Sequence, residues 1–271
     1  MPQVSVLMSL YIKEKPEYLN ASLQSILDQT LLPQEIVVVL DGPITTALQS
    51  VIDEMQKRTS RLRILPQQKN QGLGVALAIG VKACHNELIA RMDTDDIAHP
   101  ERLAKQVAAF EADPQLVICG SNIEEFDGTI DHVIGKRNLP ESDVGIRMFA
   151  RRRNPFNHMT VMFKRQAVLD AGNYQPLPGF EDYYLWTRLL KLGGKGRNLQ
   201  APLVSARTGA DMYARRGGIR YLMPGLKARW VIYRAGSGRM IDWLFVSAVH
   251  TVISIMPNRL RAWFYETKLR S

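Results

Sequence analysis

Three aspartates are crowded into four positions of this sequence, directly after a short apolar run. The segment reads ARMDTDDIAHPERL over residues 90–103, and its carboxylates belong to Asp93, Asp95 and Asp96. Crowded carboxylates repel one another, so the cluster requires a compensating positive charge. Mg²⁺ or Mn²⁺ supplies such a charge, prefers oxygen ligands and leaves coordination positions for substrate phosphates. We therefore predict a divalent cation at this cluster; the alternative is an acidic turn that caps the helix opening at Pro100.

A second pair of acids, Glu181 and Asp182, opens a predicted helix at 181–192. A carboxylate placed beside a hydroxyl group can accept its proton as a general base. The alternative is structural, because acids in the first turn of a helix are favoured by the positive end of the helix dipole.

The elements that must position these acids follow from the apolar pattern of the first 120 residues. Strands are predicted at 4–10, 35–40, 62–65 and 87–92, and helices at 16–29, 45–58, 72–84 and 100–112. Uniformly apolar strands that alternate with helices predict a parallel sheet covered on both faces. Ligands bind at the carboxyl ends of such strands. Ser9, Tyr11, Asp41 and the aspartate cluster all fall there.

The pattern changes after residue 115. Short strands are predicted at 116–121 and 132–137, and residues 151–163 run from a polar loop into a strand. This half is expected to be antiparallel or mixed. With no internal repeat and no low-complexity linker, residues 1–214 are expected to form a single α/β domain.

Five segments together resemble a known family. They are VSVLMSLY, EIVVVLDG, NQGLGVALAIG, MDTDDIAHPERL and GFEDYYLWTRL, and they occur in this order. They resemble the family 2 glycosyltransferases, which are inverting sugar-nucleotide enzymes of the GT-A type, over about residues 3–192. The resemblance implies a nucleotide-binding fold with a mostly parallel central sheet. It also implies a UDP-sugar donor and Mn²⁺ or Mg²⁺ as cofactor.

The resemblance implies roles for the residues at the strand ends. Ser9 and Tyr11 would line the nucleoside pocket, and Asp41 would hydrogen-bond the uracil. Asp93 and Asp95 occupy the two acidic positions of the D-x-D motif, which place the ribose and the metal-bound diphosphate.

Further roles are implied outside the D-x-D pair. Asp96 would share the metal with Asp95, Asp182 would be the catalytic base, and Glu181 would lie on the donor side. His158 could approach the donor diphosphate or the acceptor, or it could be a structural histidine. The Arg151–Arg153 triplet, Arg153 included, could cover the diphosphate, reach an anionic lipid acceptor, or form a solvated basic loop.

The expected chemistry is a single displacement at the anomeric carbon. The metal supplies positive charge where the leaving diphosphate gains negative charge, so no protein acid is needed there. One base and one displacement invert the configuration, so an α-linked donor gives a β-linkage.

Several positions depart from the common family pattern. Leu40 stands where many relatives have an acid. Many relatives also carry a basic residue in the helix after the N-x-G segment, where this chain has Ala76, Leu77 and Ala78. The loop with Gly72 and Gly74 could cradle a phosphate or simply turn the chain into a helix. Leu226 stands at the Gln position of the Q-x-x-R-W motif of processive members, so we predict the addition of a single sugar.

The whole excess of positive charge lies in the tail. Residues 215–271 hold 11 Lys and Arg against Asp242 and Glu266, whereas the first 214 residues hold 24 of each sign. Within the tail, residues 240–256 are strongly apolar and are flanked by basic residues and tryptophans. This composition is typical of a helix in the interface of an anionic membrane. The alternative is a helix that packs on the domain or in a homodimer.

The resemblance also implies two partners, a UDP-sugar and a polyprenyl-diphosphate-linked saccharide acceptor of the kind used in bacterial surface polysaccharide synthesis. The tail adds an anionic membrane surface as an expected partner, and no nucleic acid is expected. We expect a cytoplasmic protein, peripheral at the inner face of the plasma membrane, since the N-terminus has no signal-peptide pattern. The competing functions are a nucleotidyltransferase and a non-catalytic nucleotide-sugar binding protein.

Overall fold

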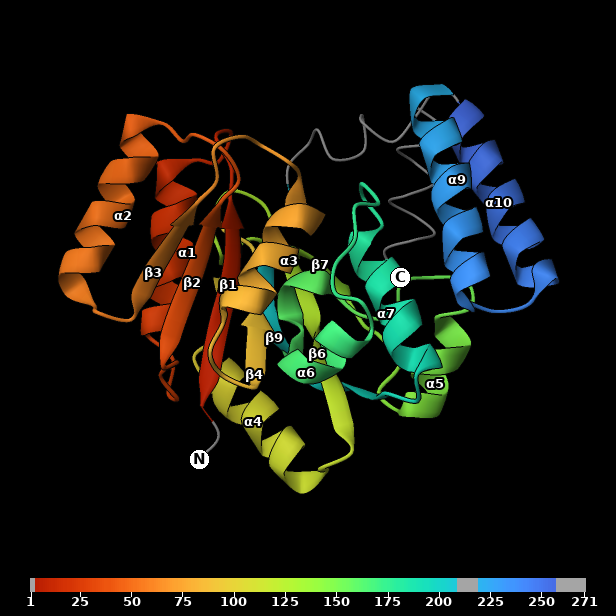
Figure 1. Ribbon diagram of the computed structural model, residues 1–271, viewed down its shortest axis with the longest axis horizontal. Helices are drawn as coiled ribbons and strands as arrows, with labels where there is room; N and C mark the ends of the chain where they lie inside the picture. Colours follow the sequence, from red (N-terminus) through yellow and green to blue (C-terminus); the bar gives the residue numbers. More distant parts are fainter. Residues whose placement is uncertain (1–2, 209–218, 257–271) are drawn as a thin grey trace.

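A mixed sheet forms the centre of the computed structural model, which describes residues 3–208 and 219–256 (Figure 1). The strand order is β3-β2-β1-β4-β8-β6-β9-β5, with β7 paired to β6. The strands are β1 (Val4–Leu10), β2 (Glu35–Leu40), β3 (Leu62–Pro66), β4 (Leu88–Arg91), β5 (Ile97–Ala98), β6 (Leu116–Phe126), β7 (Val133–Arg137), β8 (Met162–Lys164) and β9 (Lys195–Arg207). The helices are α1 (Pro16–Leu27), α2 (Thr46–Arg58), α3 (Leu73–Ala83), α4 (Arg102–Ala112), α5 (Asp143–Phe149), the 3₁₀ turn η1 (His158–Thr160), α6 (Arg165–Asp170), α7 (Glu181–Lys191), α9 (Ile219–Ala235) and α10 (Met240–Ile255).

The first four strands are parallel, so their carboxyl ends meet at one edge. In this register Leu10 lies opposite Leu40, and Leu7 lies opposite Arg91. Beyond β4 the sheet becomes mixed, because β8 runs antiparallel to both β4 and β6. Both predictions, a parallel first half and a mixed second half, are therefore confirmed.

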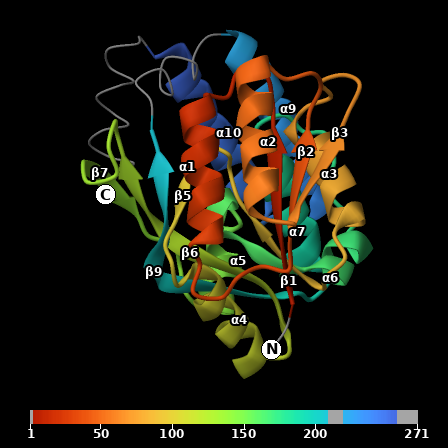
Figure 2. The same ribbon diagram turned by 90° about the vertical axis from the view of Figure 1, so that its left-hand side faces the viewer.

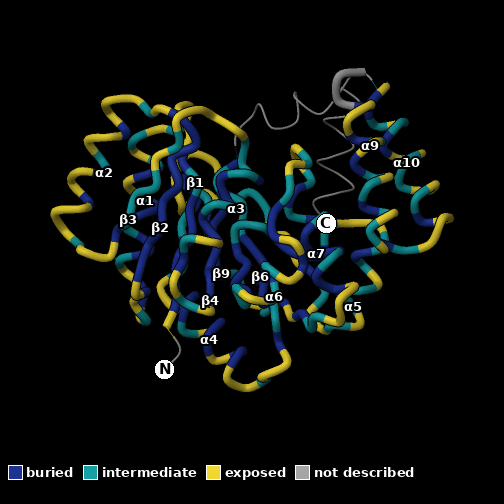
Figure 3. The backbone as a smooth tube through the Cα atoms, viewed as in Figure 1, coloured by how far each residue is buried: buried dark blue, intermediate teal, exposed yellow. Residues whose placement is uncertain are grey.

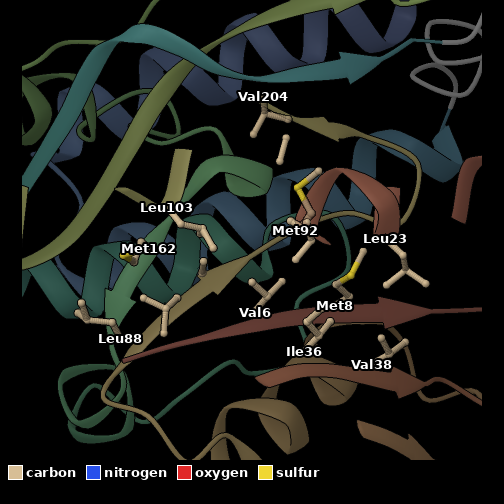
Figure 4. Close-up of a cluster of buried hydrophobic side chains, with 14 of the residues drawn as sticks. Val6, Met8, Leu23, Ile36, Val38, Leu88, Met92, Leu103, Met162 and Val204 are labelled. Atoms are coloured by element: carbon tan, nitrogen blue, oxygen red, sulfur yellow. The ribbon is translucent and has the colours of Figure 1, made fainter. Parts of the chain in front are cut away.

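The apolar strands bury side chains on both faces, as a two-sided parallel sheet requires. Val6, Met8, Ile36 and Val38 join one cluster, in which Leu23 of α1 also lies (Figure 4). The alternate residue Leu7 packs into the other cluster, with side chains from α3, α6 and α7. Figure 2 shows α1 and α2 side by side against the first face. The protein is thus a three-layer α/β/α structure.

The elements of the first half lie within two residues of their predicted bounds, but several later elements were missed. The long strand β9 reads KGRNLQAPLVSAR, and its polar first half masks the apolar second half. Helices α5 and α6 have 7 and 6 residues, so they are too short to show a helical repeat.

Helices α9 and α10 pack side by side as a hairpin, and α9 also packs on α7 (Figure 1). Helix α10 buries its polar side chains against the rest of the protein. Asp242, His250 and Ser254 are buried, and they lie on one side of the helix because they are separated by eight and four residues. Its exposed large side chains are apolar, and they are Met240, Ile241, Leu244, Phe245, Val249, Val252 and Ile255 (Figure 3). A Cβ on Gly225 of α9 would lie 2.0 Å from Nε2 of His250, so only glycine permits this close helix contact.

Two arginines anchor α10 to the α/β domain. The Asp242 carboxylate accepts hydrogen bonds from Arg151 Nη2 at 2.7 Å and from Arg152 Nε at 2.7 Å. In the turn before α10, the Ser237 hydroxyl donates to the carbonyl of Ala150. The hairpin is therefore held by the same short segment, residues 150–152, that continues toward Asn154.

The predicted boundary between residues 214 and 215 lies outside the described residues, as do Arg259, Arg261, Trp263, Lys268 and Arg270 of the predicted basic tail. Within the described residues, no helix combines the length and apolarity needed to span a bilayer.

Replacing Asp242 with Asn should lower the free energy of unfolding by about 1–2 kcal/mol at pH 7, because the buried partner of two half-exposed arginines is lost. The Arg239 amide and the two arginines lower the pKa of Asp242 to about 2. The wild-type advantage is therefore present above the ordinary aspartate pKa and is lost as the pH falls toward 2. Urea unfolding at pH 7 and pH 3 measures both effects.

The exposed Asp53 of α2 provides the matched control, since Asp53→Asn removes the same charge far from the hairpin. Equal stability of D242N and D53N at pH 7 would show that the two arginines do not anchor α10.

Candidate active site

A cavity of about 610 Å³ lies at the carboxyl ends of β1, β2 and β4, and we call it the donor cavity. It is large enough for a nucleotide, since small-molecule pockets measure roughly 300–1,000 Å³. Its lining residues are Ser9, Tyr11, Lys13, Glu14, Lys15, Tyr18, Asp41, Asn70, Gly72, Leu73, Asp93, Thr94 and Asp95. Five residues predicted from the sequence to bind the donor, Ser9, Tyr11, Asp41, Asp93 and Asp95, are therefore brought together here.

Asp93 has a positive partner inside the protein. Arg91, the last residue of β4, is fully buried and grips both carboxylate oxygens of Asp93 through its two terminal nitrogens. Burial lowers the pKa of Arg91, but the charge of Asp93, its hydrogen bond and the charges of Tyr174 and Asp96 together raise that pKa above its ordinary value. Arg102 of α4 donates to the Arg91 carbonyl at 2.6 Å, which fixes the strand end.

The other two aspartates have different surroundings. The buried Asp96 carboxylate accepts the backbone N–H of Arg207 at 2.8 Å, so it faces β9 and does not line the donor cavity. Asp95 lines the cavity, and among the described residues no basic side chain forms an ion pair with its carboxylate. Burial, with the charges of Asp93 and Glu14, raises the pKa of Asp95 to about 7.

One face of α1 holds the segment that carries the aspartates. The polar side chains of Ser22 and Ser25 are buried on this face, and so is that of Gln29, which follows the end of the helix. Ser22 donates to the Asp93 carbonyl at 2.8 Å, and Ser25 accepts the Ala98 amide at 3.1 Å. Gln29 accepts the amide of Leu103 and donates to the carbonyl of His99. This face holds the backbone of residues 93–103 along its length.

Asp41 fixes the glycine loop that follows β3. Its two carboxylate oxygens accept the amides of Gln71 at 2.7 Å and Gly72 at 3.0 Å. Gly72 has φ +92° and is the N-cap of α3. The amides that a phosphate would need here are therefore already bound by the Asp41 carboxylate. The loop thus fits the simpler interpretation, a turn that starts a helix. By fixing this loop, Asp41 helps to set the position of Asn70 and Gly72 in the wall of the donor cavity.

A second cavity, of about 540 Å³, lies beside the first turn of α7, and we call it the arginine cavity. It is lined by Arg137, Arg152, Arg153, Asn154, Pro178, Gly179, Phe180, Asp182, Tyr183, Pro224, Gly225 and Arg229. Asp182 accepts a hydrogen bond from Asn154 Nδ2 at 2.5 Å and one from the Tyr183 amide at 2.7 Å. Burial raises the pKa of Asp182 against the lowering effect of both donors. A carboxylate with a raised pKa suits a general base.

Glu181 and His158 line neither cavity. The Glu181 side chain accepts the Phe180 amide at 3.1 Å and packs beside Gly74 of α3, where a Cβ would lie 3.2 Å from that of Glu181. His158 contacts the Tyr174 hydroxyl through Nε2 at 2.9 Å and packs edge-on against Trp186. Burial, with the nearby charge of Arg91, lowers the pKa of His158 well below its ordinary value. This placement favours the structural interpretation of His158.

The three arginines at 151–153 do not share the same contacts. Arg151 and Arg152 bind Asp242, whereas Arg153 is exposed and lies over the Phe149 ring. Arg153 lines the arginine cavity and not the donor cavity.

Comparison with known proteins decides the family. The profile of Glycosyl transferase family 2 matches residues 5–171. This chain is a family 2 glycosyltransferase. It is 40% identical over 265 residues to the amylovoran biosynthesis glycosyltransferase AmsE of Erwinia amylovora, covering 97% of each chain. It is 33% identical over 269 residues to an Escherichia coli UDP-Gal:α-D-GlcNAc-diphosphoundecaprenol β-1,3-galactosyltransferase, covering 99% of this chain and 97% of the relative.

Solved structures show the same GT-A fold. Staphylococcus aureus TarS 1–349 in complex with UDP-GlcNAc superposes with a TM-score of 0.67 at 16% identity, over 98% of this chain and 76% of that one. The mannosyltransferase PcManGT of Pyrobaculum calidifontis, in complex with GDP-Man and Mn²⁺, gives a TM-score of 0.65 at 17% identity, over 96% and 72%.

The donor cavity of this glycosyltransferase fits a cation that arrives with its nucleotide. The described residues contain no group of three or more His, Cys, Asp or Glu side chains that could hold a metal ion by themselves. Mg²⁺ binds through one or two carboxylates together with substrate phosphates. Asp95, with its raised pKa and no ion-pair partner among the described residues, provides such a carboxylate.

Sequence reasoning missed several residues of this glycosyltransferase site. Glu14 accepts the Thr94 hydroxyl at 2.7 Å and adds negative charge beside Asp95. Its position just after β1 was the available signal. Arg91 also left a signal, because it is a charged residue within the apolar run ELIARM. No sequence signal identified Asn154, since its contact joins a loop to the first turn of α7, 28 residues further along the chain.

Replacing Arg91 with Met should lower the free energy of unfolding of the metal-free glycosyltransferase by about 3–5 kcal/mol at pH 8, because Asp93 loses its buried partner. The loss should be smaller at pH 5, where the carboxylates around it, whose pKa values are already raised for Asp95 and Asp96, can take up protons. Urea unfolding in EDTA at both pH values measures the difference.

Arg102→Met is the matched control, since Arg102 is equally buried but bonds to the Arg91 carbonyl, Gln106 and Met92 instead of a carboxylate. Its cost should be similar at the two pH values. An R91M variant with the same pH-independent cost would refute the charge-balance interpretation.

Proposed function

We propose that this chain is an inverting, metal-dependent hexosyltransferase. It moves one hexose from a UDP-sugar to a polyprenyl-diphosphate-linked saccharide in the synthesis of a bacterial surface polysaccharide. The observation that carries the proposal is geometric. Five residues expected to bind the donor, among them Asp93 and Asp95, line one cavity. Asp182 lines a second cavity, where Asn154 holds its carboxylate.

The donor cavity supports nucleotide binding in the manner expected from the sequence. Asp41 binds the backbone of the glycine loop at this cavity. Ser9 and Tyr11 line it with a hydroxyl group and an aromatic ring, and Asp93 and Asp95 line it with carboxylates. A divalent cation held by Asp95 and the donor phosphates would offset the charge of the leaving diphosphate. Asp96, bound to the Arg207 amide, then acts on the backbone geometry of the loop.

Asp182 is proposed as the base. The acceptor hydroxyl loses its proton to the Asp182 carboxylate as its oxygen forms a bond to the anomeric carbon. The bond between that carbon and the diphosphate oxygen breaks, and UDP leaves. Asn154 holds one Asp182 oxygen, which directs the carboxylate during proton transfer. This single displacement inverts the configuration and gives a β-linkage from an α-linked donor.

The substrate class is supported by the relatives. The E. coli relative is named for UDP-Gal and a GlcNAc-diphosphoundecaprenol acceptor, and AmsE for amylovoran biosynthesis. Both align over nearly the whole chain, tail included. Leu226, in α9, replaces the Gln of the processive motif, which supports the addition of one sugar.

The α9–α10 hairpin is proposed to hold the enzyme on the cytoplasmic face of the plasma membrane, as part of a tail that comprises residues 215–271. The outer side of α10 is apolar and more than half exposed at Ile241, Phe245, Val252 and Ile255. A helix that buries its polar side and exposes its apolar side matches a membrane-interface helix. Arg234 and Arg239 at the hairpin turn add positive charge for anionic lipids.

Two variants separate metal binding from proton transfer. Asp95→Asn should remove the Mn²⁺-dependent part of UDP binding. Asp182→Asn should keep UDP binding within about twofold but lower sugar transfer by about 10²–10⁴-fold, the range for losing a general base. A panel of UDP-hexoses with a GlcNAc-diphosphate-lipid acceptor, read by UDP release and product mass, provides the assay.

Asp53→Asn serves again as the control and should match the wild type. Full transfer by D182N would exclude Asp182 as the base. Absence of transfer by the wild type with every donor, despite UDP binding, would favour a non-catalytic nucleotide-sugar binding protein.

The membrane proposal predicts that Leu244→Ser together with Ile255→Ser lowers binding to phosphatidylglycerol vesicles by about tenfold, because two exposed apolar side chains leave the interface. Cosedimentation measures the binding. Val144→Ser, which changes an equally exposed side chain on α5, should bind as the wild type does. A double variant that binds vesicles normally but loses a wild-type dimer would assign this face to a second copy instead.

A further inference from the structure

The arginine cavity carries far more positive than negative charge. Four guanidinium groups line it, those of Arg137, Arg152, Arg153 and Arg229. Asp182 is the one carboxylate among the described residues in its wall, and Asp242 binds Arg152 just behind it. Clustered guanidinium groups favour an anion, and phosphate groups match their geometry best.

The arginines also reach the proposed base electrostatically. Burial raises the pKa of Asp182, while Arg137 is among the groups that lower it. An anion bound by these arginines would therefore lie close enough to influence Asp182. The first sugar attached to that anion could then approach the carboxylate.

The two cavities share no lining residue, so they can hold two different anions. The donor cavity has its own acidic end for a metal-bound diphosphate, at Asp93 and Asp95. The arginine cavity has no pair of carboxylates that could share a metal ion among its described lining residues, and its positive charge comes from arginine side chains. A diphosphate bound without a metal fits this second arrangement.

One wall of the arginine cavity belongs to the hairpin. Pro224, Gly225 and Arg229 of α9 face it, and α9 packs against α10, whose outer side is apolar (Figure 1). A ligand with an anionic group next to a long apolar chain could place the first in the cavity and the second along the hairpin.

We propose that the arginine cavity binds the diphosphate of the lipid-linked acceptor, with Arg153 and Arg137 as direct contacts, and so presents the first acceptor sugar to Asp182. This inference rests on the proposed function. It assigns the acceptor site to residues that the donor does not use.

Farnesyl diphosphate is the probe, titrated calorimetrically into the full chain in EDTA so that no metal supports binding at the donor cavity. Arg153→Gln and Arg137→Gln should each weaken its binding by about tenfold, the loss of one charge-assisted contact. Arg153→Lys should recover part of the loss. Farnesol, which lacks the diphosphate, should show no difference between variants.

Arg61→Gln is the matched control, because Arg61 is an exposed arginine between α2 and β3, on the opposite side of the sheet from the hairpin. It should bind farnesyl diphosphate as the wild type does. Binding of UDP with Mn²⁺ should be unchanged in all of these variants.

Two results would overturn the assignment. Wild-type affinity for farnesyl diphosphate in both R153Q and R137Q would show that the cavity does not bind the diphosphate. Weakened UDP–Mn²⁺ binding in these variants, with farnesyl diphosphate unaffected, would assign the arginines to the donor. If farnesyl diphosphate binding follows the expected pattern but no sugar is transferred, the diphosphate site stands and the proposed function fails.

Discussion

The arrangement of the site depends on how one buried arginine divides the charge of three neighbouring carboxylates. Arg91 neutralises Asp93 directly, and a backbone amide serves Asp96. Asp95 is left with burial and repulsion, both of which favour its protonated form. Asp93 and Asp96 are thus paired with groups of the protein itself, whereas Asp95 has no ion-pair partner among the described residues. Under the proposed function, a divalent cation and the substrate phosphates would balance the charge of Asp95.

The fold of the first half could be predicted because its apolar runs, helical repeats and strand ends are local signals. The rule that ligands bind at the carboxyl ends of parallel strands also predicts from the sequence alone that Ser9, Tyr11, Asp41, Asp93 and Asp95 lie together, as they do in the donor cavity. The roles of the individual carboxylates could not be predicted, because they depend on partners distant in sequence. Asp96 meets Arg207 across 111 positions, and Asp182 meets Asn154 across 28. The ion pairs of Arg151 and Arg152 could not be predicted for the same reason, since Asp242 lies 90 residues beyond Arg152.

The scaffold around the donor cavity is rigid where the chemistry requires it. Buried polar side chains of α1 bind the backbone of the aspartate loop, and Asp41 binds that of the glycine loop. Both loops are thus fixed by hydrogen bonds to regular elements, so donor binding does not have to order them. The proposed acceptor side is built differently, from the first turn of α7, a loop and a helix of the hairpin. These pieces come from separate parts of the chain, so their arrangement depends on long-range packing.

The contact between Asp242 and the segment at 150–152 has a consequence for anyone who wishes to retarget such enzymes. Two residues beyond that contact, Asn154 already holds the carboxylate of Asp182. A chimera that carries a foreign hairpin alone would place it against Arg151 and Arg152, which pair with Asp242 in this chain. A misfit there would lie only a few residues from Asn154 and the proposed base Asp182. The loop at 150–154 and the α9–α10 hairpin should therefore be transferred together.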